Sequence, residues 1–327
     1  MQKVSLITTV LNDEAGTQAL LDALLEQTMQ PDEIVVVDGG SKDNTVALLE
    51  SYVNRFKRLT ILHLAGANIS EGRNFAIQHA QNSLIAVTDA GCRPDSNWLG
   101  EITKPLFADP DLDAVSGLVI PESTSLLEYY CGLLALPDHA SKNQDGMFYG
   151  RNSAFRRPVW EKIGGYPVWL YTGEDSLFAK AAKEHGFSAL HTPAAKVYWR
   201  PRSSWKKIAK MFFLYGKGNG RILWGDIKGC LYWLKYHGLF WLSLLIGCFY
   251  PVFWLASVFA AARFYRSVFS PALAKVGKID KRATRFFYVP LITYVRSIST
   301  NLGYLSGYLE FKKDPSFKNQ LDNYMAN

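Results

Sequence analysis

Short apolar runs rich in β-branched residues alternate with amphipathic stretches through the first two hundred residues. The apolar runs predict strands at residues 4–10, 34–37, 59–64, 84–88, 114–119 and 147–155. The amphipathic stretches predict helices that end near residues 27, 54, 79 and 107, then helices over 157–163 and 174–185. This alternation predicts an α/β fold with a mostly parallel central sheet.

Acidic and amide side chains follow several of these predicted strands. Residues 12–14 (Asn-Asp-Glu) follow the first strand, Asp38 ends the second, and Asp89 follows the fourth. The carboxyl ends of parallel strands meet at one edge of a sheet, where open α/β folds bind ligands. We therefore expect these side chains to lie together.

The stretch after Asp38 has the composition of a tight turn leading into a helix. Gly39 and Gly40 tolerate backbone conformations that other residues avoid, and Ser41 or Asp43 is a suitable N-cap. Helix N-termini attract phosphate groups. On its own, however, the stretch is equally well explained as an ordinary βα turn in which Asp38 is a turn residue.

Two common nucleotide-binding motifs are absent from the sequence. No Gly-x-Gly-x-x-Gly follows a predicted strand, and no Gly-x-x-x-x-Gly-Lys-Ser/Thr occurs. A dinucleotide-binding Rossmann site and a P-loop are therefore disfavoured.

Charge divides the chain into two parts. Residues 1–199 contain 16 Lys/Arg and 24 Asp/Glu (net −8), and residues 200–327 contain 20 Lys/Arg and 5 Asp/Glu (net +15). A basic, aromatic-rich segment indicates nucleic acid or an anionic membrane surface. Long apolar runs interrupt the basic residues and no recognition motif is present, so nucleic-acid binding is disfavoured.

Cysteine spacing and the start of the chain bear on its environment. The four cysteines show no Cys-x-x-Cys pattern, which predicts free thiols in a reducing compartment and no zinc site. The first residues lead directly into a strand and carry no signal-peptide pattern, so we expect none.

Together, the polar motifs resemble those of family 2 glycosyltransferases with the GT-A fold. They are Asn-Asp-Glu at 12–14, Val-Asp-Gly-Gly-Ser at 37–41, Gly-Arg-Asn at 72–74, Thr-Asp-Ala-Gly-Cys at 88–92, Gly-Arg-Asn-Ser-Ala-Phe-Arg at 150–156, Ile-Gly-Gly-Tyr at 163–166 and Gly-Glu-Asp-Ser at 173–176. Each motif is weak alone, but they follow the family's order. The resemblance implies a catalytic domain over residues 1–200, a nucleoside-diphosphate sugar donor and a divalent cation, Mg²⁺ or Mn²⁺.

The resemblance also implies roles on the donor side. Glu14 and Asp38 match positions that hold the nucleotide base, and Arg73 matches a position near the base and the diphosphate. Asp89 matches the first carboxylate of an Asp-x-Asp motif, near the ribose and the metal. Gly91 stands where the second carboxylate is expected. Asp89 with water and diphosphate holds the metal, or another residue compensates, or the metal requirement is weaker.

On the acceptor side, Asp175 matches the family's catalytic base, and Glu174 is expected to position the acceptor or the base. Two acids at a helix start are also favourable with the helix dipole alone. His191, expected just after a strand, is a minor candidate for the metal side. Some family members carry a tryptophan-arginine motif that closes over the donor, so Arg200 and Arg202 are candidate diphosphate contacts.

The remaining residues have a membrane-seeking composition. Residues 201–237 predict a basic amphipathic interface region, with a helix over about 203–215. Residues 238–327 predict a hydrophobic helical region. Within it, residues 238–262 contain no charge and are long enough to span a bilayer, and residues 286–309 contain one charge, Arg296.

The topology of this region stays open at the level of sequence. Both flanks of residues 238–262 are basic, so the positive-inside rule favours the cytoplasmic face for both. One solution is a re-entrant hairpin broken near Gly247 and Pro251, with residues 286–309 lying in the interface. A pair of spanning helices and a soluble helical subdomain are the alternatives.

The sequence therefore predicts an inverting glycosyltransferase at the cytoplasmic face of the cell membrane. Its donor is a nucleotide sugar, with a UDP-sugar favoured, and its acceptor is a hydroxyl of a lipid or lipid-linked glycan. A polyprenyl-phosphate sugar transferase and an inactive GT-A-like scaffold are the alternatives. A nucleotidyltransferase is disfavoured, because residues 11–14 are acidic where a basic glycine-rich loop is expected.

Overall fold

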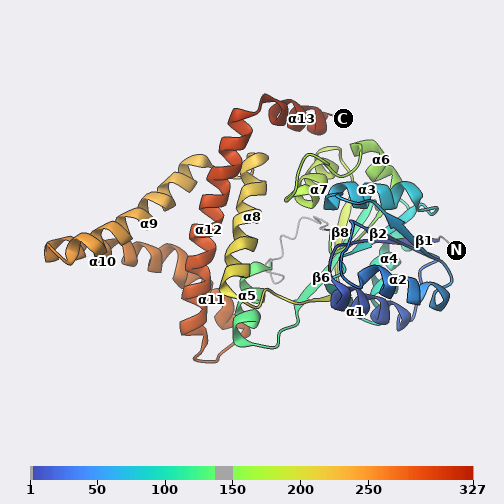
Figure 1. Cartoon of the computed structure of the whole chain (residues 1–327), viewed down its shortest axis with the longest axis horizontal. Helices are drawn as coiled ribbons and strands as arrows, with labels where there is room; N and C mark the ends of the chain where they lie inside the picture. The colour runs from blue at the N-terminus through green and yellow to red at the C-terminus, as the bar shows by residue number, and fades with distance from the viewer. Residues whose placement is uncertain (1–2, 137–149, 327) are drawn as a thin grey trace. The chain divides into compact units, whose positions relative to one another are not determined.

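The chain divides into two compact units. The computed structural model describes residues 3–136 and 150–326 (Figure 1). The first unit comprises Met1–Ile120, His139–Arg200 and Asn319–Asn327, and the second comprises Pro121–Asp138 and Pro201–Lys318.

The first unit is built on an eight-stranded sheet with the order β3-β2-β1-β4-β7-β6-β8-β5. Its strands are β1 (Val4–Val10), β2 (Glu33–Asp38), β3 (Leu59–His63), β4 (Leu84–Thr88), β5 (Cys92–Pro94), β6 (Ala114–Pro121), β7 (Asn152–Arg156) and β8 (Ala189–Trp199). The half formed by β3, β2, β1 and β4 is parallel, as predicted. By contrast, β7 runs antiparallel to both β4 and β6, so the whole sheet is mixed.

The antiparallel pairing of β4 with β7 matters for the site. It sets Thr88, the last residue of β4, opposite Asn152, the first residue of β7. In the parallel half, Val10 at the end of β1 pairs with Asp38 at the end of β2. The ends of three strands and the start of a fourth therefore share one edge of the sheet.

Helices and a buried strand core complete the first unit. The helices are α1 (Glu14–Leu25), α2 (Thr45–Tyr52) with the short η1 (Val53–Arg55), α3 (Ile69–His79), α4 (Trp98–Ala108), α6 (Arg157–Ile163), α7 (Glu174–Glu184) and the last part of α13 (Pro315–Ala326). Apolar side chains such as Leu6, Val36 and Val87 are 0% exposed. This burial on both faces explains the continuous β-branched runs of the central strands.

Several predicted boundaries shift for local reasons. Helix α3 is capped by Asn68, because Asn68 and Glu71 form a capping box with bonds of 3.0 and 2.8 Å. His191 lies inside β8, not after a strand. The predicted strand at 147–155 is described only from residue 150, and β7 begins at Asn152.

The second unit is helical. Its elements are α5 (Leu126–Ala135), α8 (Trp205–Arg221), α9 (Ile227–Gly247), η2 (Pro251–Phe253), α10 (Trp254–Phe264), the π-helical η3 (Tyr265–Phe269), α11 (Ser270–Ile279) and α12 (Arg285–Lys313). The apolar residues 286–309 lie within α12.

Helices α8 and α12 lie side by side and touch through glycine (Figure 1). Gly216 and Gly220 lie one turn apart on α8, as do Gly303 and Gly307 on α12. A Cβ on any of the four would overlap backbone atoms of the other helix. Such small-residue seams are typical of helix pairs in membranes.

An ion-pair cluster adds to this contact between α8 and α12. Glu310 on α12 accepts from Lys217 and Arg221 on α8, each with an ion-pair distance of 2.6 Å. These pairs lie beside the glycine seam and fix which turns of the two helices meet.

The apolar stretch at 238–262 is broken rather than continuous. Helix α9 ends at Gly247, the chain turns, and α10 returns antiparallel along α9, with Ser243 and Ser257 hydrogen-bonded at 2.7 Å. One of the three predicted arrangements included a break near Gly247 and Pro251, and the structure contains this break. Among the described residues, one helical segment, Pro251–Ile279, is long and apolar enough to cross a membrane, with a mean hydropathy of 1.2.

The glycine seam generates a stability prediction. We expect Gly220→Leu or Gly307→Leu to destabilise the protein by about 1–3 kcal/mol or more, because the added atoms must push two helix backbones apart. The measurement is thermal unfolding of the full chain in detergent. Gly277→Ala, with no other atom near its Cβ position, is the control and should be neutral or slightly stabilising. Equal melting temperatures for all variants would contradict the packing role.

Candidate active site

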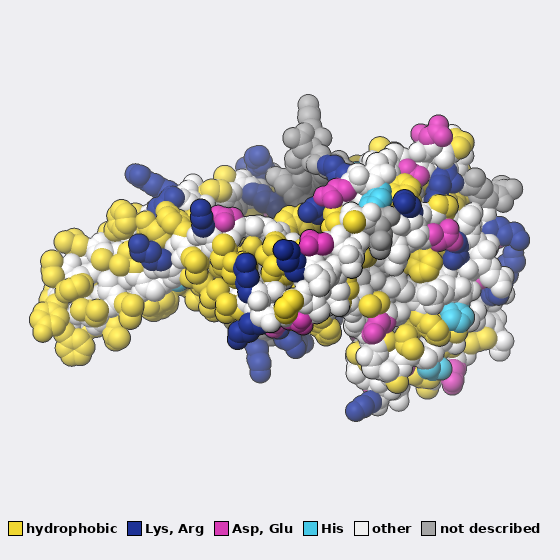
Figure 2. All heavy atoms as spheres, turned by 90° about the horizontal axis from the view of Figure 1, so that it is seen from above, with side chains coloured by type: hydrophobic (Ala, Val, Ile, Leu, Met, Phe, Trp, Pro, Cys, Tyr) yellow, Lys and Arg dark blue, Asp and Glu magenta, His cyan; other side chains and the backbone are white. Residues whose placement is uncertain are grey.

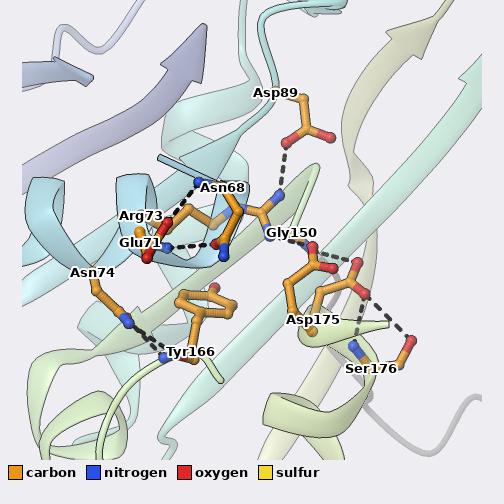
Figure 3. Close-up of polar contacts among 10 residues, drawn as sticks. Asn68, Glu71, Arg73, Asn74, Asp89, Gly150, Tyr166, Asp175 and Ser176 are labelled. Carbon is orange, nitrogen blue, oxygen red and sulfur yellow. Dashed lines mark hydrogen bonds and ion pairs between the residues drawn. The ribbon is translucent and has the colours of Figure 1, made fainter. Parts of the chain in front are cut away.

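A buried guanidinium links two carboxylates at the carboxyl edge of the sheet (Figure 3). Arg73 on α3 is 2% exposed. Its Nη2 donates to Asp89 Oδ1 at 2.8 Å and its Nη1 donates to Glu174 Oε1 at 3.0 Å. Asp89 follows β4 and Glu174 opens α7, so one cation joins two segments that are far apart in sequence.

The residues around Arg73 form a close-fitting cage. A Cβ on Gly150 would overlap the Arg73 guanidinium, so only glycine fits there. The Tyr166 ring lies beside the guanidinium, with its centroid 5.3 Å from Cζ. Asn74 holds Tyr166 through two backbone bonds of 2.8 and 2.7 Å. Within the Gly-Arg-Asn motif at 72–74, Asn74 thus helps to fix the surroundings of Arg73. The sequence alone did not reveal this role.

The charges of this cluster respond to burial and to one another. Burial acts to lower the pKa of Arg73, but Asp89 and Glu174 outweigh it and the pKa is raised, so Arg73 is a permanent cation. Burial, and then the neighbouring Asp175, raise the pKa of Glu174 to about 7, with Arg73 opposing them. Glu174 therefore changes its charge near neutral pH.

Asp175 is the more accessible of the two adjacent acids. Its Oδ1 accepts from the backbone N–H of Ser176 at 2.7 Å. From the residues that the structure describes, its Oδ2 accepts one long bond, from Gly150 N–H at 3.3 Å. The side chain is half-buried. Gly173, with φ of 83°, makes the left-handed turn that starts α7 and presents both acids. Oδ2 thus retains the capacity to accept a proton.

The turn after β2 organises the neighbouring part of the edge. Asp38 is 2% exposed, and its Oδ2 accepts from the N–H groups of Gly40 and Ser41 at 2.9 and 3.0 Å. Gly40 has φ of 98°, a conformation that favours glycine. Asp38 therefore has the turn role that the sequence allowed. Glu14 is exposed on the first turn of α1, after the neighbouring strand β1.

The loops after β1 and β2 are fastened together. Asn12 Oδ1 accepts from Lys42 N–H at 2.8 Å, and Ser41 Oγ accepts from Asn12 N–H at 2.9 Å. Asp13 caps α1 by accepting from Gly16 N–H at 3.1 Å. The nucleotide side of the predicted site is therefore a fixed surface built from two strand ends.

The residues present fit a divalent cation only in part. The described residues contain no group of three or more His, Cys, Asp or Glu side chains arranged for a metal. The side chain of Asp89 is 32% exposed and only its Oδ1 is engaged by Arg73. The side-chain atom nearest to a Cβ on Gly91 would be Asp13 Oδ2, at 3.8 Å. Asp89, with Asp13 near the gap at Gly91, suits an ion carried mainly by substrate phosphates and water.

The other predicted site residues have different surroundings. His191 Nδ1 lies 3.0 Å from Ser116 Oγ, and burial lowers the pKa of His191, so its ring is neutral. Arg200 and Arg202 are both exposed. Arg200 ends a segment of the first unit and Arg202 belongs to the second, so their contact with a diphosphate stays a prediction.

The comparison with protein families decides the class of this domain. The family described as Glycosyl transferase family 2 matches residues 5–164. Residues 5–164, just under half of the chain, therefore match a family 2 glycosyltransferase domain. This match spans the donor-side motifs from β1 to α6, and the acids that open α7 lie just beyond it.

Two relatives and one solved structure are similar to this chain over longer stretches. Glycosyltransferase AglE of Haloferax volcanii is 27% identical over 222 residues, covering 66% of this chain and 72% of AglE. O-antigen chain rhamnosyltransferase RfbN of Salmonella typhimurium is 27% identical over 210 residues, covering 60% of this chain and 65% of RfbN.

The structure of mannosyltransferase PcManGT from Pyrobaculum calidifontis, in complex with GDP-Man and Mn²⁺, aligns with a TM-score of 0.62 at 22% identity. It covers 96% of this chain and 88% of that chain. This likeness supports the GT-A fold predicted from the motifs.

The pKa of Glu174 generates a spectroscopic prediction. We expect an infrared band of a protonated carboxylic acid that disappears as the pH rises through about 7, because a raised pKa keeps the proton bound below that value. In Glu174→Gln this titrating band should be absent. A spectrum of the wild-type protein with no carboxylic acid band between pH 5 and 7 would contradict the assignment.

Proposed function

We propose that this protein is an inverting glycosyltransferase that moves a sugar from a nucleoside-diphosphate sugar, with a UDP-sugar favoured, to a hydroxyl of a lipid or lipid-linked glycan. The observation that carries the proposal is the ion-paired cluster of Arg73, Asp89 and Glu174 beside Asp175. In this cluster, the donor-side carboxylate of Asp89 and the candidate catalytic base Asp175 lie close to the same buried guanidinium. The cluster lies in a region that is similar to family 2 glycosyltransferases.

In the proposed reaction, the acceptor hydroxyl attacks the anomeric carbon of the donor sugar from the side opposite the diphosphate. The new bond joins the acceptor oxygen to that carbon as the bond to the diphosphate oxygen breaks. Asp175 Oδ2 takes the hydroxyl proton, because Oδ1 is already bonded to Ser176 N–H. The nucleoside diphosphate leaves with the electron pair.

On the donor side, Asp89 would hold the divalent cation that neutralises the departing diphosphate, with Asp13 as a second acid near Gly91. Glu14 and Asp38 would contact the nucleotide base. Arg73 is buried and ion-paired with two carboxylates, so we assign it to positioning these acids rather than to direct contact with the diphosphate. Arg200 and Arg202 remain the proposed diphosphate cations.

On the acceptor side, Glu174 lies directly beside Asp175, and we assign it to positioning the base or the acceptor. At a pH below its pKa of about 7, Glu174 is protonated and can donate a hydrogen bond. It then adds no second negative charge beside Asp175.

The acceptor class and the location rest on the second unit and on the relatives. The basic flanks of the apolar stretch favour the cytoplasmic face, which also supplies nucleotide sugars. An O-antigen chain rhamnosyltransferase among the relatives supports a glycan chain as acceptor. A polyprenyl-phosphate acceptor is the second candidate, since an anionic phosphate oxygen needs no base.

The base assignment is tested by Asp175→Asn. We expect the turnover of donor and acceptor to fall by about 10²- to 10⁴-fold, because the amide cannot take the proton, while donor binding is kept. The measurement pairs sugar transfer to membrane lipid extract with nucleotide-sugar binding in detergent. Asp111→Asn, an exposed acid of the first unit, is the matched control and should transfer at the wild-type rate.

Two results would overturn parts of this proposal. If Asp175→Asn transferred sugar at the full rate, Asp175 would not be the base and a phosphate acceptor would be favoured. If the wild-type protein bound nucleotide sugars but neither transferred nor hydrolysed any of them, the scaffold alternative would replace the enzyme.

A further inference from the structure

The α9–α10 hairpin exposes a large apolar surface (Figure 2). Phe249 at its turn is 78% exposed, and Leu255 on α10 is 70% exposed. Other exposed large apolar residues on its two arms and turn are Trp241, Leu242, Leu245, Tyr250, Val252, Trp254, Val258 and Phe259. Contiguous apolar surfaces of this kind mark a partner surface or a membrane contact.

Hydrogen bonds and a close ring contact join the two arms, so the hairpin is a formed element rather than an unfolded remnant. Ser243 on α9 and Ser257 on α10 hydrogen-bond at 2.7 Å, and Ser257 also donates to the Phe240 carbonyl at 3.3 Å. The Trp254 ring occupies the space that a side chain on Gly247 would need. Ser243 and Ser257 therefore point between the arms, whereas many large apolar side chains of the hairpin face outward.

Charge is absent from the outer part of the hairpin and concentrated where its two arms begin and end. Residues 236–262 contain no Lys, Arg, Asp or Glu, while Lys235 and Arg263 stand at the two ends of this stretch. Arg266, Lys275 and Lys278 follow on the α10 side. A hairpin with a neutral, apolar turn and positive charges at its other end complements a bilayer that carries anionic headgroups.

The base of the hairpin holds both arms together. Arg263 Nε donates to Tyr232 Oη at 2.8 Å, and the guanidinium also lies over the Trp233 ring, 5.7 Å from its centroid. Tyr232 and Trp233 belong to α9, whereas Arg263 belongs to α10. The residues that flank the apolar stretch on its two sides are therefore held together.

The length of the arms matches one leaflet. The charge-free part of each arm is about twelve residues, 236–247 and 251–262, or about 18 Å of helix. The hydrocarbon core is about 30 Å thick, so the tip would reach near its middle. If Pro251–Ile279 crossed the bilayer instead, Arg263 and Arg266 would lie at its centre, which is costly for a charged side chain.

We infer that the α9–α10 hairpin is a re-entrant membrane anchor, which inserts into one leaflet of an anionic bilayer and enters and leaves at the same face. The partner is the lipid itself. The inference does not depend on which sugar or acceptor the enzyme uses, and the tests below do not use sugar transfer.

The first experiment locates three points of the hairpin in the bilayer. Cys248 at the turn is exposed, whereas Cys92, Cys131 and Cys230 are buried, so Cys248 can be labelled with a nitrobenzoxadiazole fluorophore. Lys235→Cys and Arg266→Cys, each combined with Cys248→Ser, place the same label at exposed sites on the two arms. The labelled full chain is added to sealed vesicles of phosphatidylcholine and phosphatidylglycerol, and dithionite is then added outside.

We expect external dithionite to reduce the labels at positions 235 and 266 while the label at 248 stays protected. Lipids brominated in the middle of the acyl chain should quench the label at 248 most strongly. Protection of only one of the two arm labels would show a spanning helix and overturn the inference. Reduction of all three labels would show a soluble hairpin and would overturn it as well.

The second experiment removes the apolar tip. Phe249→Glu combined with Leu255→Glu should lower the fraction of protein that floats with the vesicles by about tenfold or more, because two charges must enter hydrocarbon. Leu190→Glu makes the same chemical change at an exposed leucine of β8 and should float like the wild type. Circular dichroism checks that each variant is folded. Wild-type flotation of the folded double variant would overturn the inference.

Discussion

The buried guanidinium of Arg73 is the interaction on which the candidate site depends. A cation that is 2% exposed needs counter-charges, and here Asp89 and Glu174 supply them from β4 and α7. Breaking such a pair by removing one partner typically costs about 3–5 kcal/mol. The shape and position of this ion-paired guanidinium are matched by the residues around it, Gly150, Tyr166 and Asn74. The separate motifs of the first unit are therefore parts of one electrostatic assembly.

This assembly also explains how two adjacent acids have different properties. Glu174 faces the buried cation and its pKa is raised to about 7, whereas Asp175 points toward Gly150 with one carboxylate oxygen only weakly bonded. In the second unit, glycines allow α8 and α12 to pack closely, and the hairpin between these two helices has an outer part without charge. One unit thus holds the proposed chemistry, and the other has the composition of a membrane contact.

Much of the fold could be predicted from local pattern, but the contacts that define the site could not. The β-branched runs and turn glycines located β1, β2 and β4, and with them Asp38 and Asp89 at one edge. The partners of Arg73 could not be found, because Glu174 lies 101 positions away in sequence and no local spacing links them. The antiparallel pairing of β7 with β4 was missed for the same reason. Residue type suggested the break at Gly247 and Pro251 as one of several open arrangements, because glycine and proline act locally.

The most direct test of the central claim is calorimetric titration of UDP, GDP and CMP into the detergent-solubilised protein, with Mn²⁺ and then with EDTA, for the wild type and for Asp89→Asn. The account predicts that a nucleoside diphosphate binds to the protein when Mn²⁺ is present, and that UDP is the favoured one. It also predicts that EDTA and Asp89→Asn each weaken this binding by about tenfold or more. A protein that bound none of these nucleotides, or a variant that bound UDP as tightly as the wild type, would contradict the donor site at this sheet edge.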